Sequence, residues 1–281
     1  MSVRHRHRVH DWLSVLDEPT AERRLVHALL TEAGRFPTRR TWERRLNALP
    51  HTLPAQSGGL GRCVVARLDP WATDGRAVAM DSTVLRANGG VWHQTHRDQG
   101  VVPPTSIDTA AHWTQSGWHG WGYGWKLPLV TVVAAVWIPV AAERTAAQHA
   151  DHAIARLLLP ERPPEAHVVL GDPAYADPAR HQRGAAAGRI LITPCRGPDP
   201  HADAGVEVRR LLHKLRSRAI EHCKEQFKGM FDGHGQVPTQ GLRHTRRFAL
   251  GPIVVYHLMR WYRFEQGLDR RVGLKAFLRA A

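Results

Sequence analysis

The sequence predicts an α/β domain preceded by a small helical region. Three patterns lead to this prediction: helical spacing of apolar residues over residues 11–50, short apolar runs alternating with helical segments over residues 76–200, and helical spacing again towards the C-terminal end. The composition, 43% apolar and 23% charged over 281 residues, is that of a globular chain and excludes a collagen-like or wholly disordered protein.

The N-terminal region is interpreted as two short helices. Thr20 suits the N-cap of the first helix and Gly34 suits its end. The second helix is expected to begin after Thr38 and to end at Pro50. One of its faces is basic and carries Arg39, Arg40, Arg44 and Arg45. Such a pair is compatible with a helix-turn-helix that presents this face to DNA, and equally with an ordinary helical hairpin.

A stretch rich in proline and glycine, residues 51–75, is expected to be a linker with a short helical piece at residues 61–68. It would separate a helical region, residues 1–75, from a second domain, residues 76–281. In the second domain we expect strands at 77–80, 168–171 and 190–193, a strand pair within 122–140 that turns near Ala134 or Pro139, and helices at 146–159, 206–231 and 252–263.

The charge of the chain indicates the kind of partner. The net charge is +14 and the isoelectric point is about 10.8, which favours a polyanion. Residues 1–75 carry +4, residues 76–200 carry +1 and residues 201–281 carry +9. Basic flanks around a nearly neutral centre predict binding to nucleic-acid phosphate. The alternative is that the excess of arginine, 34 Arg against 5 Lys, reflects coding bias and a merely soluble surface.

Other classes of protein are disfavoured. Cys63, Cys195 and Cys223 are far apart, and the 19 histidines fall into no zinc-binding spacing, so neither a disulfide framework nor structural zinc is expected. The longest apolar stretch, residues 127–142, is too short to span a membrane. Because no apolar run follows the basic N-terminus, a cytoplasmic protein is expected.

Three acidic residues stand out by position. Asp81 follows the apolar run 78–80, and Asp172 follows 169–171. Glu221 lies on the long C-terminal helix, with Lys228 two turns further along the same face. Each aspartate alone is also typical of a turn or a helix cap. Together the three carboxylates predict a site for a pair of Mg²⁺ ions, which can activate water or a 3′-hydroxyl against a phosphodiester.

Three stretches that contain these acids resemble the motifs of DDE-type insertion-sequence transposases, in particular the bacterial group of insertion-sequence families four and five. They are Met80-Asp81-Ser82-Thr83, Leu170-Gly171-Asp172-Pro173-Ala174-Tyr175, and Arg218-Ala219-Ile220-Glu221 followed by Lys228. The glycine- and aromatic-rich segment 117–126 also resembles that group's entry into the second catalytic strand. The resemblance covers about residues 38–265.

The resemblance implies a ribonuclease-H-like mixed sheet flanked by helices, and Mg²⁺-dependent DNA strand transfer in which Mn²⁺ can substitute. Asp81, Asp172 and Glu221 then carry over as metal ligands, with Glu225, one turn further on, as a rival for the third. The group's tyrosine and arginine on the glutamate helix are replaced here by Lys214 and Ser217. DNA contacts are expected from the four arginines of residues 39–45 and from Lys126, Arg216, Arg218, Lys228, Arg243, Arg246 and Arg247.

The function implied is a DNA transposase that cuts element ends and joins them to target DNA, working as a homodimer on double-stranded DNA at the bacterial nucleoid. Two alternatives remain: a non-catalytic DNA-binding remnant, and a nuclease on the same core that cuts without joining. A group of tryptophans either stacks on unpaired bases or packs within the sheet: Trp92, Trp113, Trp118, Trp121 and Trp125.

Overall fold

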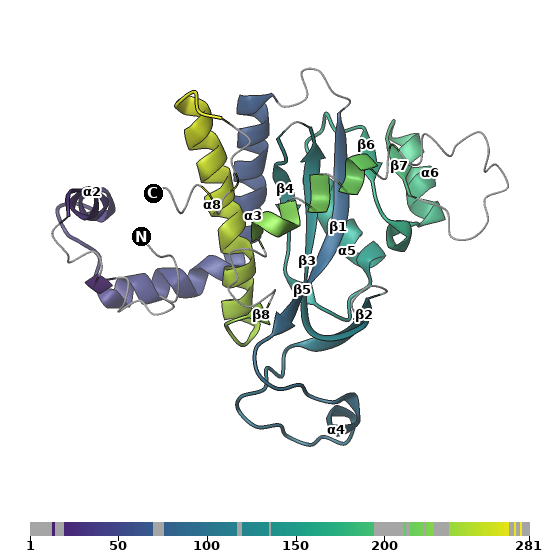
Figure 1. Ribbon diagram of the computed structural model, residues 1–281, viewed down its shortest axis with the longest axis horizontal. Coiled ribbons are helices and arrows are strands. Elements are labelled where there is room, and N and C mark those ends of the chain that lie inside the picture. The colour runs from purple at the N-terminus through teal and green to yellow at the C-terminus, as the bar shows by residue number, and fades with distance from the viewer. Residues whose placement is uncertain are drawn as a thin grey trace.

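The fold is described from a computed structural model. It describes residues 13–14, 20–69, 76–116, 120–134, 136–193, 211, 214–217, 219–221, 223–227, 236–269, 273 and 276. A curved mixed sheet stands beside two long helices, and a helical arm extends away from them (Figure 1). The α/β class predicted from the sequence is therefore confirmed.

The sheet is built around one long strand. The strand order is β2-β3-β1-β6-β7, with β4 and β5 also paired to β3 and β8 paired to β1. Pairs on the β3 side of β1 are antiparallel, whereas β6, β7 and β8 run parallel to their neighbours. The strands are β1 (Ala77–Ala87), β2 (His112–Ser116), β3 (Gly120–Val133), β4 (Pro139–Ala142), β5 (Thr145–Ala146), β6 (Val168–Leu170), β7 (Ile190–Ile192) and β8 (Gln236–Val237).

Strand β1 extends well beyond its predicted end. The expected strand stopped at Met80, but β1 continues through Asp81 to Ala87 and pairs with β3 over most of this length. The extension forms because buried and partly exposed residues alternate after Asp81, which fits a strand with one face on a core. The predicted turn near Ala134 is confirmed, since β3 ends at Val133 and β4 begins at Pro139.

Shorter helices connect the strands. α5 (Asp151–Leu158) and the 3-10 turn η1 (Leu159–Glu161) precede β6, and η2 (Pro173–Tyr175) and α6 (Pro178–Ala186) join β6 to β7. A short helix, α4 (Gln94–Asp98), lies on an excursion between β1 and β2 (Figure 1). The described residues between 211 and 227 are helical, as predicted, and this segment crosses one face of the sheet.

Helix α3 (Arg39–Leu68) corrects two predictions. It does not end at Pro50, and residues 51–68 are helix rather than linker. Pro50 and Pro54 lie inside it, and Figure 1 shows its first part running in a different direction from its second. The missing proline N–H groups and the proline rings account for this bend. The helix continues because its second part is apolar enough to be buried, through Leu53, Val64 and other residues.

The second part of α3 packs against α8 (Leu242–Glu265) and β4. Ile253 and Tyr256 of α8 lie in the same core cluster as Leu53 and Trp125. Residues on both sides of position 75 therefore share one core, and the predicted division into two domains stays a prediction. No helix among the described residues has the length and apolar character needed to cross a membrane.

The N-terminal arm consists of α2 (Ala21–Leu30), the turn that follows it and the first part of α3. Helix α2 confirms the first predicted helix. The Thr20 side chain caps it by accepting from the backbone N–H of Arg23, and Thr38 caps α3 in the same way through Thr41. Stacking of His27 on Phe36 holds α2 against the turn that leads into α3. Gly34, with a positive φ, lies in that turn and not at the helix end itself.

Candidate active site

Asp81 and Asp172 are brought together by the register of two parallel strands. Ala79 of β1 pairs with Leu170, the last residue of β6, so Asp81 lies two residues further along β1 and Asp172 two residues beyond the end of β6. The two carboxylates are close neighbours, since the charge of Asp81 raises the pKa of Asp172. The structure thus unites two of the three acids that the sequence singled out, although Asp81 lies inside a strand and not at its end.

The two faces of β1 have different roles. Ala79 packs with Leu170, Ala219 and Ile220 in one cluster, whereas Val78 and Met80 pack with α5 in another. Because side chains alternate along a strand, Asp81 lies on the face of Ala79, towards the helical segment that carries Glu221. The sequence folds this way because the helix presents Ala219 and Ile220, both buried, to the sheet.

Asp172 is held by its own turn. Its side chain accepts from the backbone N–H of Ala174 at 2.8 Å, and it caps the 3-10 turn η2. Burial raises the pKa of Asp172, and the nearby negative charge of Asp81 raises it further. Two carboxylates that repel each other in a partly buried place are a good binding site for a cation.

The third acid does not join this pair directly. The Glu221 side chain is 59% exposed, and a buried lysine stands between it and the pair. The Nζ atom of Lys224 lies 2.6 Å from Asp81 Oδ2 and 3.5 Å from Glu221 Oε1. Arg216, one of the predicted DNA contacts, places Nη1 3.5 Å from the same Asp81 oxygen. Sequence reasoning missed Lys224, although its position three residues after Glu221 puts it on a neighbouring helix face.

The donor set is suited in part to a divalent metal. Carboxylate oxygens are the ligands that Mg²⁺ prefers, and Asp81 and Asp172 supply them side by side. Among the described residues, however, no three His, Cys, Asp or Glu side chains are grouped closely enough to hold one ion. Lys224 contacts both Asp81 and Glu221, and in this arrangement Glu221 adds no third carboxylate to the pair of aspartates.

A further acid that the sequence analysis did not select lies on the opposite face of β1. Asp151, in the first turn of α5, accepts from Ser82 Oγ at 2.8 Å and from Lys126 Nζ at 3.2 Å. Tyr175 is buried nearby, and its pKa is raised well above the usual value by burial and by the charges of Asp151, Asp81 and Asp172. The signal was present in part, since Ser82 and Tyr175 belong to the two aspartate motifs.

The predicted DNA-contacting residues differ in their surroundings. Lys126 is largely buried and bonded to Asp151 and to the carbonyl of His149, which makes it part of the support of the site. Glu225, the rival third ligand, is exposed on the same helical segment as Glu221. Lys228 and Arg218 lie outside the described residues.

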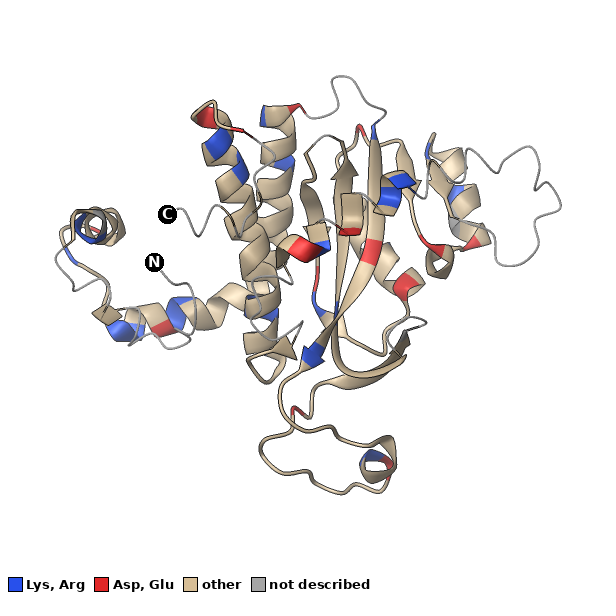
Figure 2. Cartoon of the chain, viewed as in Figure 1, with Lys and Arg blue, Asp and Glu red and all other residues tan. Residues whose placement is uncertain are grey.

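The arginines at the start of α3 are exposed, and Figure 2 shows basic residues along this outer part of the helix. Arg39 pairs with Glu43 at 2.8 Å and Arg45 with Glu32 at 2.6 Å. Arg40 and Arg44 are exposed beside them. The structure therefore brings the predicted basic face of the second helix to the surface.

The basic residues of α8 are mostly engaged within the protein. Arg246 binds both carboxylate oxygens of Glu143. Arg247 is partly buried, which lowers its pKa, and Arg243 is exposed. Of these three predicted contacts, Arg243 is the one most accessible to a ligand.

The tryptophans in the described part of the chain are divided between core and surface. Trp125 is fully buried in the sheet, with the guanidinium of Arg144 above its ring at 4.4 Å. Trp113 is partly buried and donates to the carbonyl of Trp92. Trp121 is 65% exposed, so of these it is the one open to a base. Trp118 lies outside the described residues.

No protein-family model and no curated protein matches the chain. Among solved structures it is similar to a Mos1 strand transfer complex, at 13% identity over 90% of this chain and 77% of that chain, with a TM-score of 0.24. It is also similar to a Mos1 mariner paired-end complex with Mn, at 12% identity over 89% and 75%, with a TM-score of 0.22. These TM-scores are too low to establish a shared fold.

Proposed function

We propose that this protein is a DDE-type DNA transposase with a ribonuclease-H-like core. One observation carries the proposal: Asp81 in β1 and Asp172, two residues beyond the end of the adjacent parallel strand β6, each within a motif that resembles that family, lie close enough for the charge of Asp81 to raise the pKa of Asp172. The helical segment with Glu221 packs on the same face of these strands. The mixed sheet, in which antiparallel strands join two parallel ones through β1, supports the proposed core.

In the proposed reaction, Asp81 and Asp172 would hold a divalent cation, Mg²⁺ or Mn²⁺, and Glu221 would complete the ligand set. When bound there, the ion would supply activation of an oxygen nucleophile and charge stabilisation at the scissile phosphate. In this proposal Lys224 and Arg216 contact Asp81 and also bind DNA. Both are cations within 3.5 Å of Asp81, so they are placed to bind the phosphate next to the bond that breaks.

DNA ends are proposed to bind at the N-terminal arm. Arg40 and Arg44 are exposed on α3, and a capped helix precedes it. This arrangement supports either a helix-turn-helix docked in the major groove or a helix that contacts only phosphates. Pairing of two DNA ends would require two copies of the chain, so a homodimer on DNA belongs to the proposal.

A specific observation favours a second candidate, a non-catalytic DNA-binding protein. The ion pair between Lys224 and Asp81, at 2.6 Å, satisfies an oxygen that a metal would need. In this alternative the acids and Lys224 form a structural network and the basic residues bind DNA without cutting it.

The test is a nicking and strand-transfer assay on supercoiled plasmid and labelled oligonucleotides with Mg²⁺ or Mn²⁺. Asp81→Asn and Asp172→Asn should each reduce cleavage by at least about a thousandfold, because each removes a metal ligand, while DNA binding in chelator stays within about twofold. Glu265→Gln, at the far end of α8, removes one negative charge as a control and should leave cleavage unchanged.

The outcomes separate the candidates. End-specific joining supports a transposase, cutting without joining supports a nuclease, and tight binding with neither supports the non-catalytic alternative. If Asp81→Asn and Glu265→Gln had the same effect on cleavage, the proposed metal role of Asp81 would be wrong.

The third ligand is tested by a pair of variants. Both Glu221 and Glu225 are exposed on one helical segment, but Glu221 is the one whose carboxylate approaches the Lys224 that binds Asp81. Glu221→Gln should therefore abolish cleavage and Glu225→Gln should not. The reverse result would assign the role to Glu225.

A further inference from the structure

A pocket of about 490 Å³ lies between α5, η1, α6 and β7, on the face of the sheet opposite to Asp81. Its floor is apolar and includes Ala155, Val169 and Leu191, all buried. Its size is within the range of sites that hold small organic ligands. None of the acids of the candidate active site lines it.

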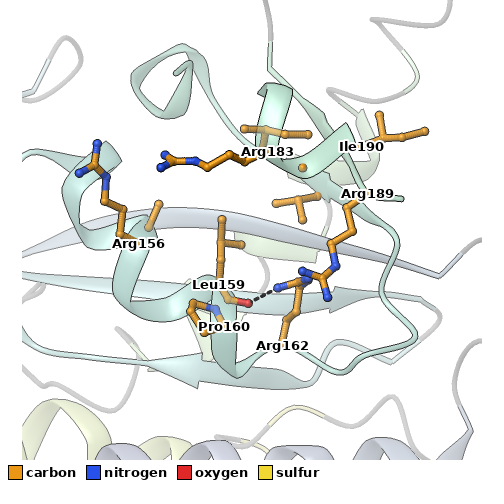
Figure 3. Close-up of a pocket in the computed structure, with 11 residues that line it drawn as sticks. Arg156, Leu159, Pro160, Arg162, Arg183, Arg189 and Ile190 are labelled. Carbon is orange, nitrogen blue, oxygen red and sulfur yellow. Dashed lines mark hydrogen bonds between the residues drawn. The ribbon is translucent and has the colours of Figure 1, made fainter. Parts of the chain in front are cut away.

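Four arginines surround this floor: Arg156, Arg162, Arg183 and Arg189 (Figure 3). Arg156 and Arg162 come from α5 and the turn after η1, whereas Arg183 and Arg189 come from α6 and the residue before β7. The pocket is therefore lined with positive charge from two separate segments, and within the described part of the chain no carboxylate side chain lines it.

The positive charge of the pocket is poorly compensated within the protein. Arg156 has a carboxylate of Asp177 at 3.8 Å, but no ion pair joins Arg162, Arg183 or Arg189 to an acid of the described residues. The pKa of Arg162 is lowered by burial and, to a smaller extent, by the nearby positive charge of Arg189. The Nε atom of Arg162 is buried without a hydrogen-bond partner among the described residues.

These properties define the ligand. Guanidinium groups that line one pocket, three of them without an ion pair to an acid of the described residues, suit a phosphate, which they can bind with paired hydrogen bonds. An apolar floor suits a planar or aliphatic group attached to that phosphate, and a guanidinium plane can stack on a base. We propose that the pocket binds one nucleotide, with its phosphate between the arginines and its base or sugar on the floor.

The same nucleotide chemistry has two sources: a free mononucleotide, or an unpaired nucleotide of a DNA strand. Because the pocket shares no residue with the acid pair, the inference does not depend on the proposed catalytic function. A failure to cut DNA would leave it standing.

The experiment measures binding to the full chain in chelator, so that no cleavage occurs. One probe is dAMP, followed by calorimetry, and the other is a short fluorescent single-stranded oligonucleotide, followed by anisotropy. The pocket variant is Arg183→Ala with Arg189→Ala, both exposed, so folding is not at risk. The matched control is Arg67→Ala with Arg86→Ala, which removes the same charge from two exposed arginines that do not line the pocket.

We expect the pocket variant to weaken dAMP binding by at least about tenfold and the control by less than about twofold. Arg183→Lys with Arg189→Lys should recover only part of the loss, because lysine keeps the charge but not the paired geometry. A parallel loss of oligonucleotide binding identifies a DNA strand as the source, and a loss confined to dAMP identifies a free nucleotide. Absence of dAMP binding to the wild type, or equal losses in pocket and control variants, would overturn the proposal.

Discussion

At the scale of single residues, Asp81 and Asp172 are held close together although their negative charges repel each other. Asp172 is partly buried next to Asp81, and its pKa is raised by both effects. A carboxyl group whose pKa is higher in the folded than in the unfolded state is destabilising once it is ionised. The site therefore costs the protein stability at neutral pH, as functional sites often do.

Asp172→Asn should raise the thermal midpoint at pH 7.5, by roughly 1–3 °C, because it removes the charge and keeps a side chain that can cap η2. The gain should shrink as the pH falls through the raised pKa of Asp172, since the wild-type carboxyl is then neutral in the folded state. Thermal melts in chelator at pH 7.5 and pH 4.5 test this, with Asp98→Asn, on the exposed helix α4, as a control that leaves the midpoint unchanged. A lower midpoint for Asp172→Asn at pH 7.5 would contradict it.

His257 gives the protein a second pH dependence. It is fully buried in α8, its Nε2 donates to the Pro139 carbonyl at 2.7 Å, and burial lowers its pKa to about 4. In the unfolded chain it would titrate near its ordinary value of about 6.5. Below that pKa the unfolded chain binds a proton at His257 and the folded protein does not. The free energy of unfolding therefore falls with falling pH until about pH 4.

The free energy of unfolding should decrease by about 2 kcal/mol between pH 7 and pH 5 through His257 alone. Urea unfolding at the two pH values measures it. His257→Gln, which keeps a donor for Pro139, should lose less stability over the same interval, whatever its stability at pH 7. An equal loss in variant and wild type would show that His257 is not responsible.

At the scale of elements, α3 shows why a proline is an unreliable sign of a helix end. Pro50 was expected to end the second helix and residues 51–75 to form a linker, but α3 passes through Pro50 and Pro54 and only bends. What the local pattern could not show is that α8 and β4 would lie beside residues 51–68 and bury them. Tertiary packing stabilised a helix that its own composition disfavours.

The close contact between α3 and β4 depends on Gly61. A Cβ atom at this position would stand 2.2 Å from the carbonyl oxygen of Pro139, whereas a Cβ at Gly59, two residues earlier, would meet nothing within 4 Å. Gly61→Ala should therefore destabilise the protein by more than about 2 kcal/mol, because backbone must move. Gly59→Ala should stabilise it by about 0.5–1 kcal/mol through helix propensity. Urea unfolding of the two variants checks both signs, and similar effects would show that the helix does not approach β4 so closely.

Site residues were predicted where their position follows from the local sequence pattern. They were missed where their position depends on the packing of segments that are distant in the sequence. Asp81 and Asp172 were found because each adjoins a buried apolar run, and their proximity follows from parallel pairing. Asp151 was missed because nothing in its local sequence sets it apart from an ordinary residue in the first turn of a helix. Lys224 was missed because only the packing of Ile220 and Phe227 turns it inward.

At the scale of the whole molecule, the N-terminal arm contributes little to the shared core. Leu25 and Leu29 of α2 are 62% and 75% exposed, and its packing is local, through His27 and Phe36. The second part of α3, in contrast, is part of the core with α8. Removal of α2 should therefore lower the free energy of unfolding less than removal of the second part of α3.

Deletion of residues 1–36, which keeps the Thr38 cap of α3, should change the thermal midpoint by less than about 3 °C. The same deletion should weaken binding to duplex DNA and lower the slope of log affinity against log salt, because it removes six arginines that can bind phosphates. Anisotropy titrations at several salt concentrations measure the slope. A large drop in the midpoint would show instead that the arm is integral to the core.

In the proposed reaction, the bend of α3 affects the position at which DNA is cleaved. One helix links the arginines near its start to the residues that pack beside the sheet. The angle at Pro50 and Pro54 therefore sets the distance between these arginines and the two aspartates, Asp81 and Asp172. If the proposed function holds, a change of that angle would shift the cleavage position by some nucleotides along the duplex without changing the affinity for DNA.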